Sequence, residues 1–183
     1  MRQALLAVAI IALAGACDPS QDAEIPAGPV TLTAEAAGHY CQMTVLDHAG
    51  PKAQVHLAGN PNPLWFTQVR DAIAYRRQRE QSAEVVAVYV SDMGRAPSWE
   101  APGADNWIDI SSAHLVVGSH RRGGMGAPEL VPFASAEDAR SFAGRHGGQI
   151  LRIDQIADDM VLGPVEVDPE NMMPGQAHHG GEG

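Results

Sequence analysis

Two twelve-residue segments of the chain resemble each other, and this similarity constrains the fold more than any other feature of the sequence. Residues 64–75 (LWFTQVRDAIAY) and 131–142 (VPFASAEDARSF) align without gaps at a spacing of 67 residues. The alignment matches Phe66 with Phe133, Asp71 with Asp138, Ala72 with Ala139 and Tyr75 with Phe142. A segment that recurs in this way indicates one supersecondary unit used twice.

Helix signals follow each aligned phenylalanine. After Phe66, Val69, Ala72 and Ile73 have the spacing of one helix face, and after Phe133 the segment SAED predicts a helix with Ser135 as its N-cap. A β-branched stretch that favours a strand comes next in each case, at residues 84–90 and 148–153. Further strands are predicted at residues 30–33, 53–58, 107–110 and 113–119.

The predicted fold is therefore α+β, with two similar ββαβ halves packed together. We place the first half at residues 30–100 and the second at 101–163, divided within the Pro/Gly-bearing segment 95–106. Residues 17–29 are polar and contain proline, and they predict a disordered tether. Residues 164–183 lack an apolar period and predict a disordered tail that contains methionine and histidine.

The N-terminus has the pattern of a signal peptide at residues 1–16. Arg2 precedes an uncharged apolar run from Ala4 to Ala14, which is too short to span a bilayer comfortably. The small residues before Cys17 resemble a bacterial lipoprotein cleavage site, although Ala14 stands where leucine is usual. This resemblance implies lipidation at Cys17, a periplasmic location and, through Asp18, retention at the inner membrane.

Charge and cysteine content limit the possible partners and bonds. A formal net charge of −10 argues against a nucleic acid partner and against binding anionic lipid by charge. If Cys17 carries lipid, Cys41 is the one remaining cysteine, and no intramolecular disulfide can form. Cys41 is then either a small buried apolar residue or a chemically active thiol.

The segment HYCQMTV, residues 39–45, favours the active role. In an extended conformation His39, Cys41 and Met43 would point to one face. Thiolate and thioether ligands favour Cu(I), whereas structural zinc sites use four ligands from Cys, His and carboxylates.

A second sulfur donor lies in the segment RRGGMGAPELVPF, residues 121–133. Met125 has glycine at positions 123, 124 and 126, so it either fills a gap in a turn or reaches a metal on the facing half. His39 or His120 could supply a further ligand. The tail pairs Met172-Met173 and His178-His179 could collect copper, or they could have no function.

The Cys-x-Met near the mature N-terminus and the GGMGAPE…PF segment resemble the NosL family, copper chaperones that supply nitrous-oxide reductase. The resemblance extends from Cys17 to about Met160. It implies a periplasmic Cu(I)-binding lipoprotein with Cys41, Met43 and Met125 as ligands. It also implies two partners in assembling the copper-sulfide centre, namely the reductase apoprotein and a membrane transporter complex.

Three other functions remain open from the residues. A blue-copper electron-transfer protein needs two histidines with the cysteine and a weak axial ligand. A thiol-dependent enzyme would use Cys41 as nucleophile, and the two-half fold expected of the family resembles the organomercurial lyases, which use more than one thiol. A purely structural lipoprotein would have an inert Cys41. We expect a carrier of copper rather than an enzyme.

Overall fold

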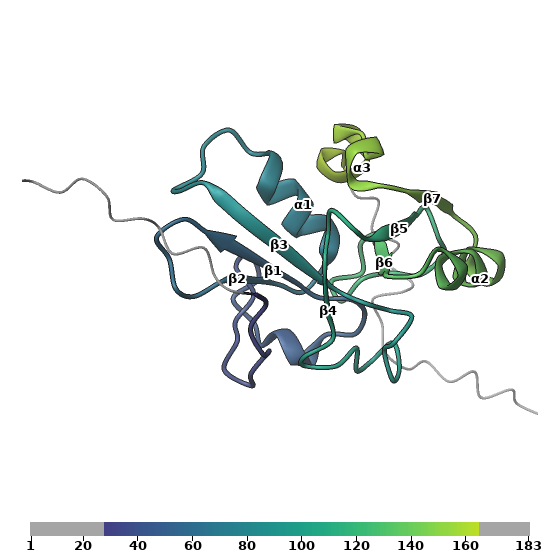
Figure 1. Ribbon diagram of the computed structural model, residues 1–183, viewed down its shortest axis with the longest axis horizontal. Helices are drawn as coiled ribbons and strands as arrows, with labels where there is room; N and C mark the ends of the chain where they lie inside the picture. Colours follow the sequence, from purple (N-terminus) through teal and green to yellow (C-terminus); the bar gives the residue numbers. More distant parts are fainter. Residues whose placement is uncertain (1–27, 165–183) are drawn as a thin grey trace, which may run out of the picture.

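The computed structural model describes residues 28–164 and contains two antiparallel sheets with helices packed on them (Figure 1). This arrangement confirms the predicted α+β fold with two ββαβ halves. The predicted signal peptide, Cys17 and most of the predicted tether lie outside the described residues, as does the predicted tail from residue 165. Among residues 28–164, no helix has the length and apolar character needed to cross a membrane.

The first sheet has the strand order β2-β1-β3-β4. Its strands are β1 (Ala53–Leu57), β2 (Leu64–Phe66), β3 (Val85–Ser91) and β4 (Trp107–Asp109), and each neighbouring pair is antiparallel. Helix α1 (Val69–Arg77) connects β2 to β3 and buries Val69, Ala72 and Ile73, the face expected from the sequence. The start of α1 therefore lies immediately after an edge strand.

The second sheet repeats this topology with the order β6-β5-β7. Strands β5 (His114–Val117), β6 (Val131–Phe133) and β7 (Gln149–Leu151) are joined by antiparallel pairing, and α2 (Ala136–His146) connects β6 to β7. In both sheets the first strand is central, the second lies on one side and the strand after the helix lies on the other. Strand β6 and helix α2 begin 67 residues after β2 and α1, the spacing seen in the sequence.

The structure corrects the expected first strands. Residues 30–33 form no strand; instead, the Val30 N–H donates to the Gln54 side chain and the Leu32 N–H to the Ala104 carbonyl. The strand expected at 107–110 is formed as β4, but it pairs with β3 and so belongs to the first sheet. The second strand of each half is the three-residue segment before the helix, LWF in the first half and VPF in the second. Three residues are too few to show the period-2 alternation by which a strand is identified in a sequence.

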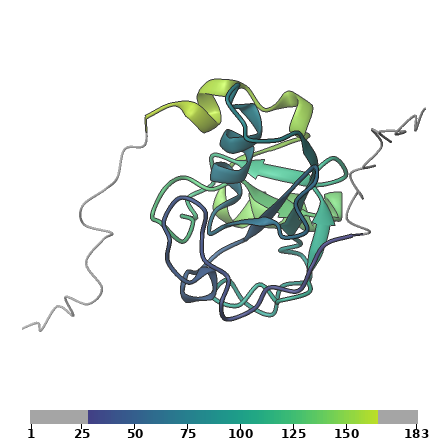
Figure 2. The same cartoon turned by 90° about the vertical axis from the view of Figure 1, so that its left-hand side faces the viewer.

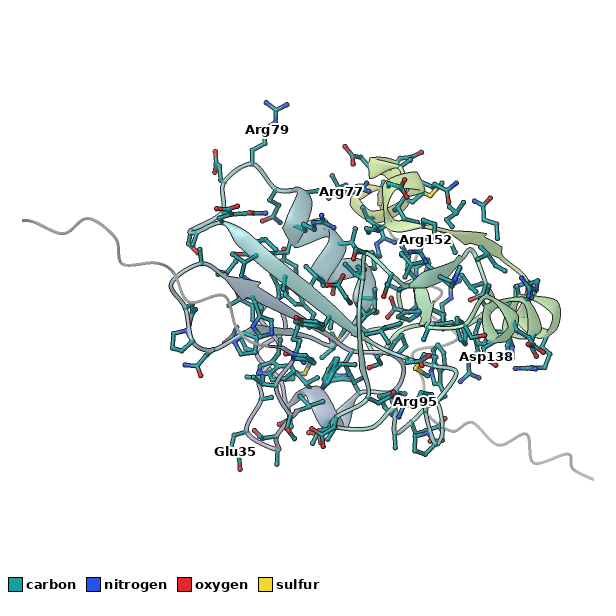
Figure 3. All side chains as sticks on the ribbon, viewed as in Figure 1. Glu35, Arg77, Arg79, Arg95, Asp138 and Arg152 are labelled. Atoms are coloured by element: carbon teal, nitrogen blue, oxygen red, sulfur yellow. The ribbon has the colours of Figure 1, made fainter. Side chains whose placement is uncertain are left out.

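Three short helices complete the described chain. They are the 3₁₀ turns η1 (Val45–Asp47) and η2 (Ile153–Gln155) and the helix α3 (Asp158–Leu162). Figure 2 shows α1 and α3 side by side. Arg70 donates from Nε to the Val161 carbonyl (3.2 Å), and Arg77 pairs with Asp158 (2.6 Å). In Figure 3, Arg77 lies toward α3 whereas Arg79 points into solvent.

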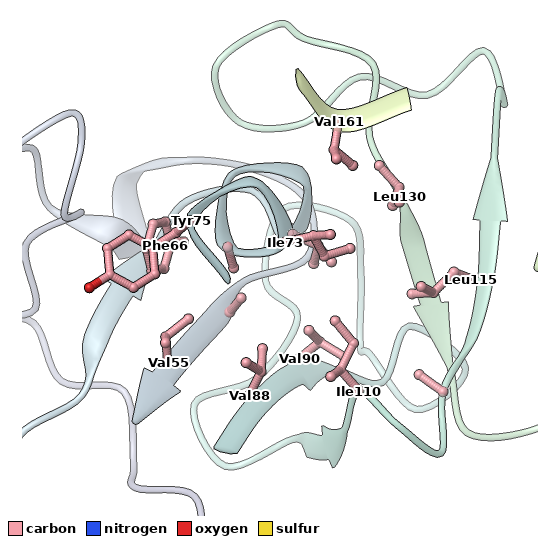
Figure 4. Packing of buried hydrophobic residues seen from close by; sticks show 14 of the residues in the cluster. Val55, Phe66, Ile73, Tyr75, Val88, Val90, Ile110, Leu115, Leu130 and Val161 are labelled. Atoms are coloured by element: carbon pink, nitrogen blue, oxygen red, sulfur yellow. The ribbon is translucent and has the colours of Figure 1, made fainter. Parts of the chain in front are cut away.

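One hydrophobic core connects the two halves. Buried side chains of the first sheet and α1 pack with Leu115, Leu130 and Val161 from the second half (Figure 4). A smaller cluster lies beneath α2, around Phe133 and Phe142. A third, formed by Leu32, Ala36 and Val45, holds the N-terminal segment against the protein.

Candidate metal site

Cys41 lies in a tight turn, so the predicted extended conformation of residues 39–45 is wrong. The Gly38 N–H donates to the Met43 carbonyl (2.9 Å), and the Gln42 N–H donates to the Gly38 carbonyl (2.8 Å). Gln42 has a φ of 56°, in the left-handed region. Its side-chain amide donates to the His39 carbonyl (2.7 Å), a local bond that favours the turn over a strand.

The Cys41 thiol packs against the backbone of Gly38. A Cβ at position 38 would lie 2.5 Å from Cys41 Sγ and 3.4 Å from Thr67 Cγ2. A side chain at position 38 would displace the sulfur, so the glycine allows the thiol its present place. Cys41 is half-buried and free, so the thiol is not enclosed in the apolar core.

The His39 ring packs among aromatic side chains instead of sharing a strand face with Cys41. Its centroid lies 5.2 Å from that of Tyr75 and 5.6 Å from that of Phe66. The His39 N–H donates to the Trp65 carbonyl (2.7 Å) and fixes the turn to strand β2. His39 therefore anchors the turn that holds the thiol.

Both thioethers are unusually exposed for methionines. Met43 is 43% and Met125 39% exposed, and Tyr40 and Leu46 nearby in sequence are exposed as well. Met125 therefore does not fill a gap in the core. A soft donor held at the surface is accessible to an incoming ion or protein.

The loop around Met125 is held by side chains from the first half. The Met125 N–H donates to Gln68 Oε1 (3.2 Å), and the ring Nδ1 of His48 contacts the Gly124 carbonyl (3.1 Å). Gly126 has a φ of 77°, which turns the loop back after the methionine. A Cβ at position 124 would lie 2.6 Å from His48 Cβ, so the glycine allows the close approach.

The turn of residues 38–43, which carries Cys41, and the loop around Met125 both contact the same short segment at the start of α1. Thr67 lies against the Gly38 position that supports Cys41, and the next residue, Gln68, holds Met125. A second connection runs through His48, which follows Met43 and η1 in the chain. The structure thus brings together the two segments that carry Cys41, Met43 and Met125.

A buried carboxyl group lies beneath the loop. Glu129 Oε1 accepts from the Arg70 and Leu130 N–H groups (3.1 and 2.9 Å), while Oε2 is buried with no hydrogen-bond partner among the described residues. Burial raises the pKa of Glu129 to about 8. A Cβ at Gly123 would lie 2.6 Å from Oε2 and 2.5 Å from Gln68 Oε1, so the loop backbone rests directly on both groups.

Lys52 fixes the other support of the loop. Its ammonium donates to the carbonyls of His48 (2.5 Å), Ala49 (3.2 Å) and Gly50 (2.8 Å). Burial lowers the pKa of Lys52 to about 8, against the opposing effect of the Glu129 carboxylate. These three hydrogen bonds order the segment that carries His48, and they therefore order the contact between His48 and Gly124.

Sequence reasoning missed these supporting residues. Gln68, Lys52 and Glu129 have no motif of their own, and His48 received no functional interpretation. One signal was present: Gln68 stands at the position that the repeat aligns with Ser135, where a capping residue is expected.

His120 lies apart from the residues that hold Met125. Its N–H donates to the His146 carbonyl (2.9 Å) at the end of α2, and its ring faces Gly147. Within residues 28–164, no three side chains from His, Cys, Asp and Glu come together as a metal-holding group.

Comparison with known proteins gives a consistent result. The family model described as NosL matches residues 29–161. The chain is 52% identical to the copper-binding lipoprotein NosL of Achromobacter cycloclastes, over 91% of this chain and 86% of that protein. Identity to the copper-binding lipoprotein NosL of Stutzerimonas stutzeri is 35%, over 83% and 78%. The crystal structure of the copper chaperone NosL from Shewanella denitrificans superposes with a TM-score of 0.67 at 29% identity, covering 72% of this chain and 96% of that one.

Proposed function

Because this chain belongs to the NosL family, we propose that it is a lipid-anchored copper chaperone of the cell envelope that carries Cu(I) as cargo. The observation that supports the proposal most is the meeting of the Cys41–Met43 turn and the Met125 loop at Thr67–Gln68. The copper-related names of the relatives support the choice of metal.

The proposed ligands are the Cys41 thiolate and the thioethers of Met43 and Met125. One anionic and two neutral sulfur donors suit the soft Cu(I) ion. Cys41 binds as the thiolate, so copper uptake releases its proton. Gly38 and Gln68 then act without touching copper, because they place the thiol and the Met125 backbone.

The exposure of both methionines supports transfer rather than catalysis. A Cu(I) ion with few ligands can be attacked by a thiolate or thioether of a receiving protein before it leaves its carrier. The exposed Met43 and Met125 would be the first ligands that such a donor meets. In this proposal Cys41 is a metal ligand and not an enzymatic nucleophile.

The proposed client is the nitrous-oxide reductase apoprotein, whose copper-sulfide centre is assembled together with a membrane transporter complex. This step is supported by the resemblance of the GGMGAPE…PF segment to the family. We further propose a lipid on Cys17 and retention at the periplasmic face of the inner membrane, supported by the signal-like residues 1–16 and by Asp18.

The ligand set is tested by Cu(I) titration against a competing chelator. Cys41→Ser should lower the affinity by about a thousandfold or more, because it removes the one anionic donor. Met43→Ala and Met125→Ala should each lower it by at least about tenfold, or ~1.4 kcal/mol.

Met160→Ala is the matched control, since Met160 is a thioether that packs against the core from α3. It should leave the affinity unchanged. Equal affinity in the wild type and in all three ligand variants would refute the proposed site.

The client is tested separately by mixing the copper-loaded protein with apo-reductase and following copper on both proteins after separation. Transfer that is faster than from free chelated Cu(I), and that is lost in Cys41→Ser, is the expected result. Loading of the reductase at the rate of the chelator alone would exclude it as a direct client.

A further inference from the structure

A pocket of about 240 Å³ lies between the segment from Met93 to Trp99 and the C-terminal end of α2. Its apolar wall is formed by the stacked rings of Trp99 and Phe142, whose centroids are 6.3 Å apart at an interplanar angle of 14°. Trp99 is seated on Gly50, where a Cβ would lie 3.1 Å from the ring. The wall is therefore fixed to the Gly50 backbone that Lys52 also holds.

Cationic and imidazole side chains line the rest of the pocket. The Arg121 guanidinium lies over the Trp99 ring at 4.2 Å from its centroid, and the His146 ring lies 4.5 Å from Phe142. Arg145 donates to Ser141 Oγ (2.6 Å). Within the described part of the chain the one ion pair joins Arg77 to Asp158, so neither pocket arginine is neutralised by a carboxylate there.

The stacked Arg121 guanidinium still has hydrogen-bond donors available for a carboxylate ligand. A guanidinium that stacks on an aromatic ring keeps its N–H groups in the plane, where they can bind a carboxylate through two parallel bonds. The carboxylates Glu137 and Asp138 belong to the first turn of α2, whereas Arg145 and His146 belong to its last turn. Burial together with Arg121, Arg145 and His120 lowers the pKa of His146, as expected where positive charge gathers.

The pocket and the loop of Met125 are connected through one backbone segment. Trp99 is seated on Gly50, and a Cβ at Gly124 would lie 2.9 Å from the Ala49 carbonyl oxygen, so the pocket wall and the methionine loop both rest on residues 49–50. The remainder of the protein is acidic, with a formal net charge of −10 for the whole chain. An acidic partner would be repelled by most of the surface and attracted at this pocket, which fixes its orientation.

We propose that the pocket of Trp99, Arg121, Phe142, Arg145 and His146 docks a carboxylate-bearing segment of the protein that exchanges copper at Met125. The inference rests on the proposed function, because it names the chemistry of the exchanging partner. Docking and metal binding use different residues, and they can therefore be tested independently.

The test uses the processed chain, residues 17–183, and two synthetic peptides followed by calorimetry. The probe is acetyl-Ala-Glu-Glu-Ala-Glu-amide, and its counterpart has glutamine in place of each glutamate. We expect the acidic peptide to bind and the glutamine peptide to bind at least about tenfold more weakly, since hydrogen bonds to charged groups are stronger than those between neutral groups.

Arg145→Gln should weaken binding of the acidic peptide by about tenfold. The matched control is Arg140→Gln, which removes the same charge from an exposed position of the same helix without touching the pocket. It should leave peptide binding unchanged. Thermal unfolding of both variants verifies that Arg145→Gln folds, and Arg121→Gln provides a second test at the stacked position.

Three results would overturn the inference. They are equal binding of the two peptides, equal losses in Arg140→Gln and Arg145→Gln, and tighter peptide binding after removal of residues 165–183, which would identify the chain's own acidic tail as the occupant. Arg145→Gln should bind Cu(I) like the wild type. A failed Cu(I) titration with intact peptide binding would count against the proposed function alone, and the reverse result against the docking site alone.

Discussion

Gln68 shows how a single side chain connects helix α1 to the Met125 loop. Its Oε1 accepts from the Met125 N–H and its Nε2 donates to Asp71 Oδ2 (3.1 Å). The position aligned with it, Ser135, caps α2 by accepting from the Glu137 and Asp138 N–H groups. In the first half the N-cap Gln68 makes no capping bond from its side chain. One duplicated position thus caps a helix in one half and positions a loop in the other.

Gln68→Ala should lower the Cu(I) affinity by about tenfold to a hundredfold, as is typical when a residue that orients a metal ligand is lost. Chelator competition measures this effect. Gln81→Ala is the matched control, since Gln81 donates to backbone carbonyls at the other end of α1. An unchanged affinity in Gln68→Ala would show that the loop holds its place without this bond.

Glu129 should make the free energy of unfolding fall as pH rises. Its pKa is raised from an ordinary value of 4.5 to about 8 in the folded protein. Between these values the unfolded chain has lost the proton that the folded chain keeps, so increasing pH favours unfolding. Lys52 acts above about pH 8, where its lowered pKa makes stability rise with pH.

Urea denaturation of wild type and Glu129→Gln at pH 5 and pH 8 tests the contribution of Glu129. The glutamine keeps an oxygen that can accept from the Arg70 and Leu130 N–H groups but does not titrate. The variant should therefore lose less stability than the wild type between the two pH values. An equal fall in the free energy of unfolding between pH 5 and pH 8 in both proteins would contradict the assignment of this pH dependence to Glu129.

At the scale of elements, the helix of each half is where the sequence pattern was most informative. Apolar spacing identified α1, and the SAED segment identified the start of α2. Ser135→Ala should therefore lower the free energy of unfolding by about 1 kcal/mol, because two N–H groups lose their acceptor. Ser135→Gly should cost only a few tenths of a kcal/mol. An unchanged free energy of unfolding in Ser135→Ala, measured by urea denaturation, would mean that the cap bonds contribute little.

The strands were predicted less well, for physical reasons that differ between segments. Residues 30–33 have a strand-like composition but bond to Gln54 and Ala104 instead of a neighbouring strand. Residues 39–45 combine Tyr, Thr and Val, yet Gly38 and the left-handed Gln42 close them into a turn. Composition alone cannot show such long-range and local hydrogen bonds.

Of the candidate site, only the sulfur-bearing residues could be predicted from the sequence. Cys41, Met43 and Met125 stand out by residue type and glycine context, and they remain predicted ligands. The residues that place them, Gln68 and Lys52, act through backbone groups brought together by folding. Ordinary polar residues with such contacts carry no local pattern.

At the scale of the whole molecule, the two halves should unfold together. The main core joins Val55 and Val90 of the first sheet to Leu115 and Leu130 of the second half. Between the sheets, the Met93 N–H donates to the Pro132 carbonyl (2.9 Å) and Asp92 Oδ1 accepts from the Ala134 N–H (3.1 Å). Neither half therefore has a complete core without the other.

Leu115→Ala should lower the free energy of unfolding by about 2–5 kcal/mol while leaving one transition, because it opens a cavity in the shared core. Far-ultraviolet circular dichroism and tryptophan fluorescence should give the same midpoint for wild type and for the variant. Separate midpoints, with a shift in only one of them, would mean that the halves are independent.

The segment that carries Cys41 also lies along strand β2, the outer strand of the first sheet. Gly38 forms an isolated β-bridge with Trp65, and the His39 N–H donates to the Trp65 carbonyl. An uncovered outer strand is a template on which a second molecule can add its own strand. The turn that carries Cys41 thus also covers part of this edge, and we expect a chain shortened to begin after it to aggregate as well as to lose the proposed copper site.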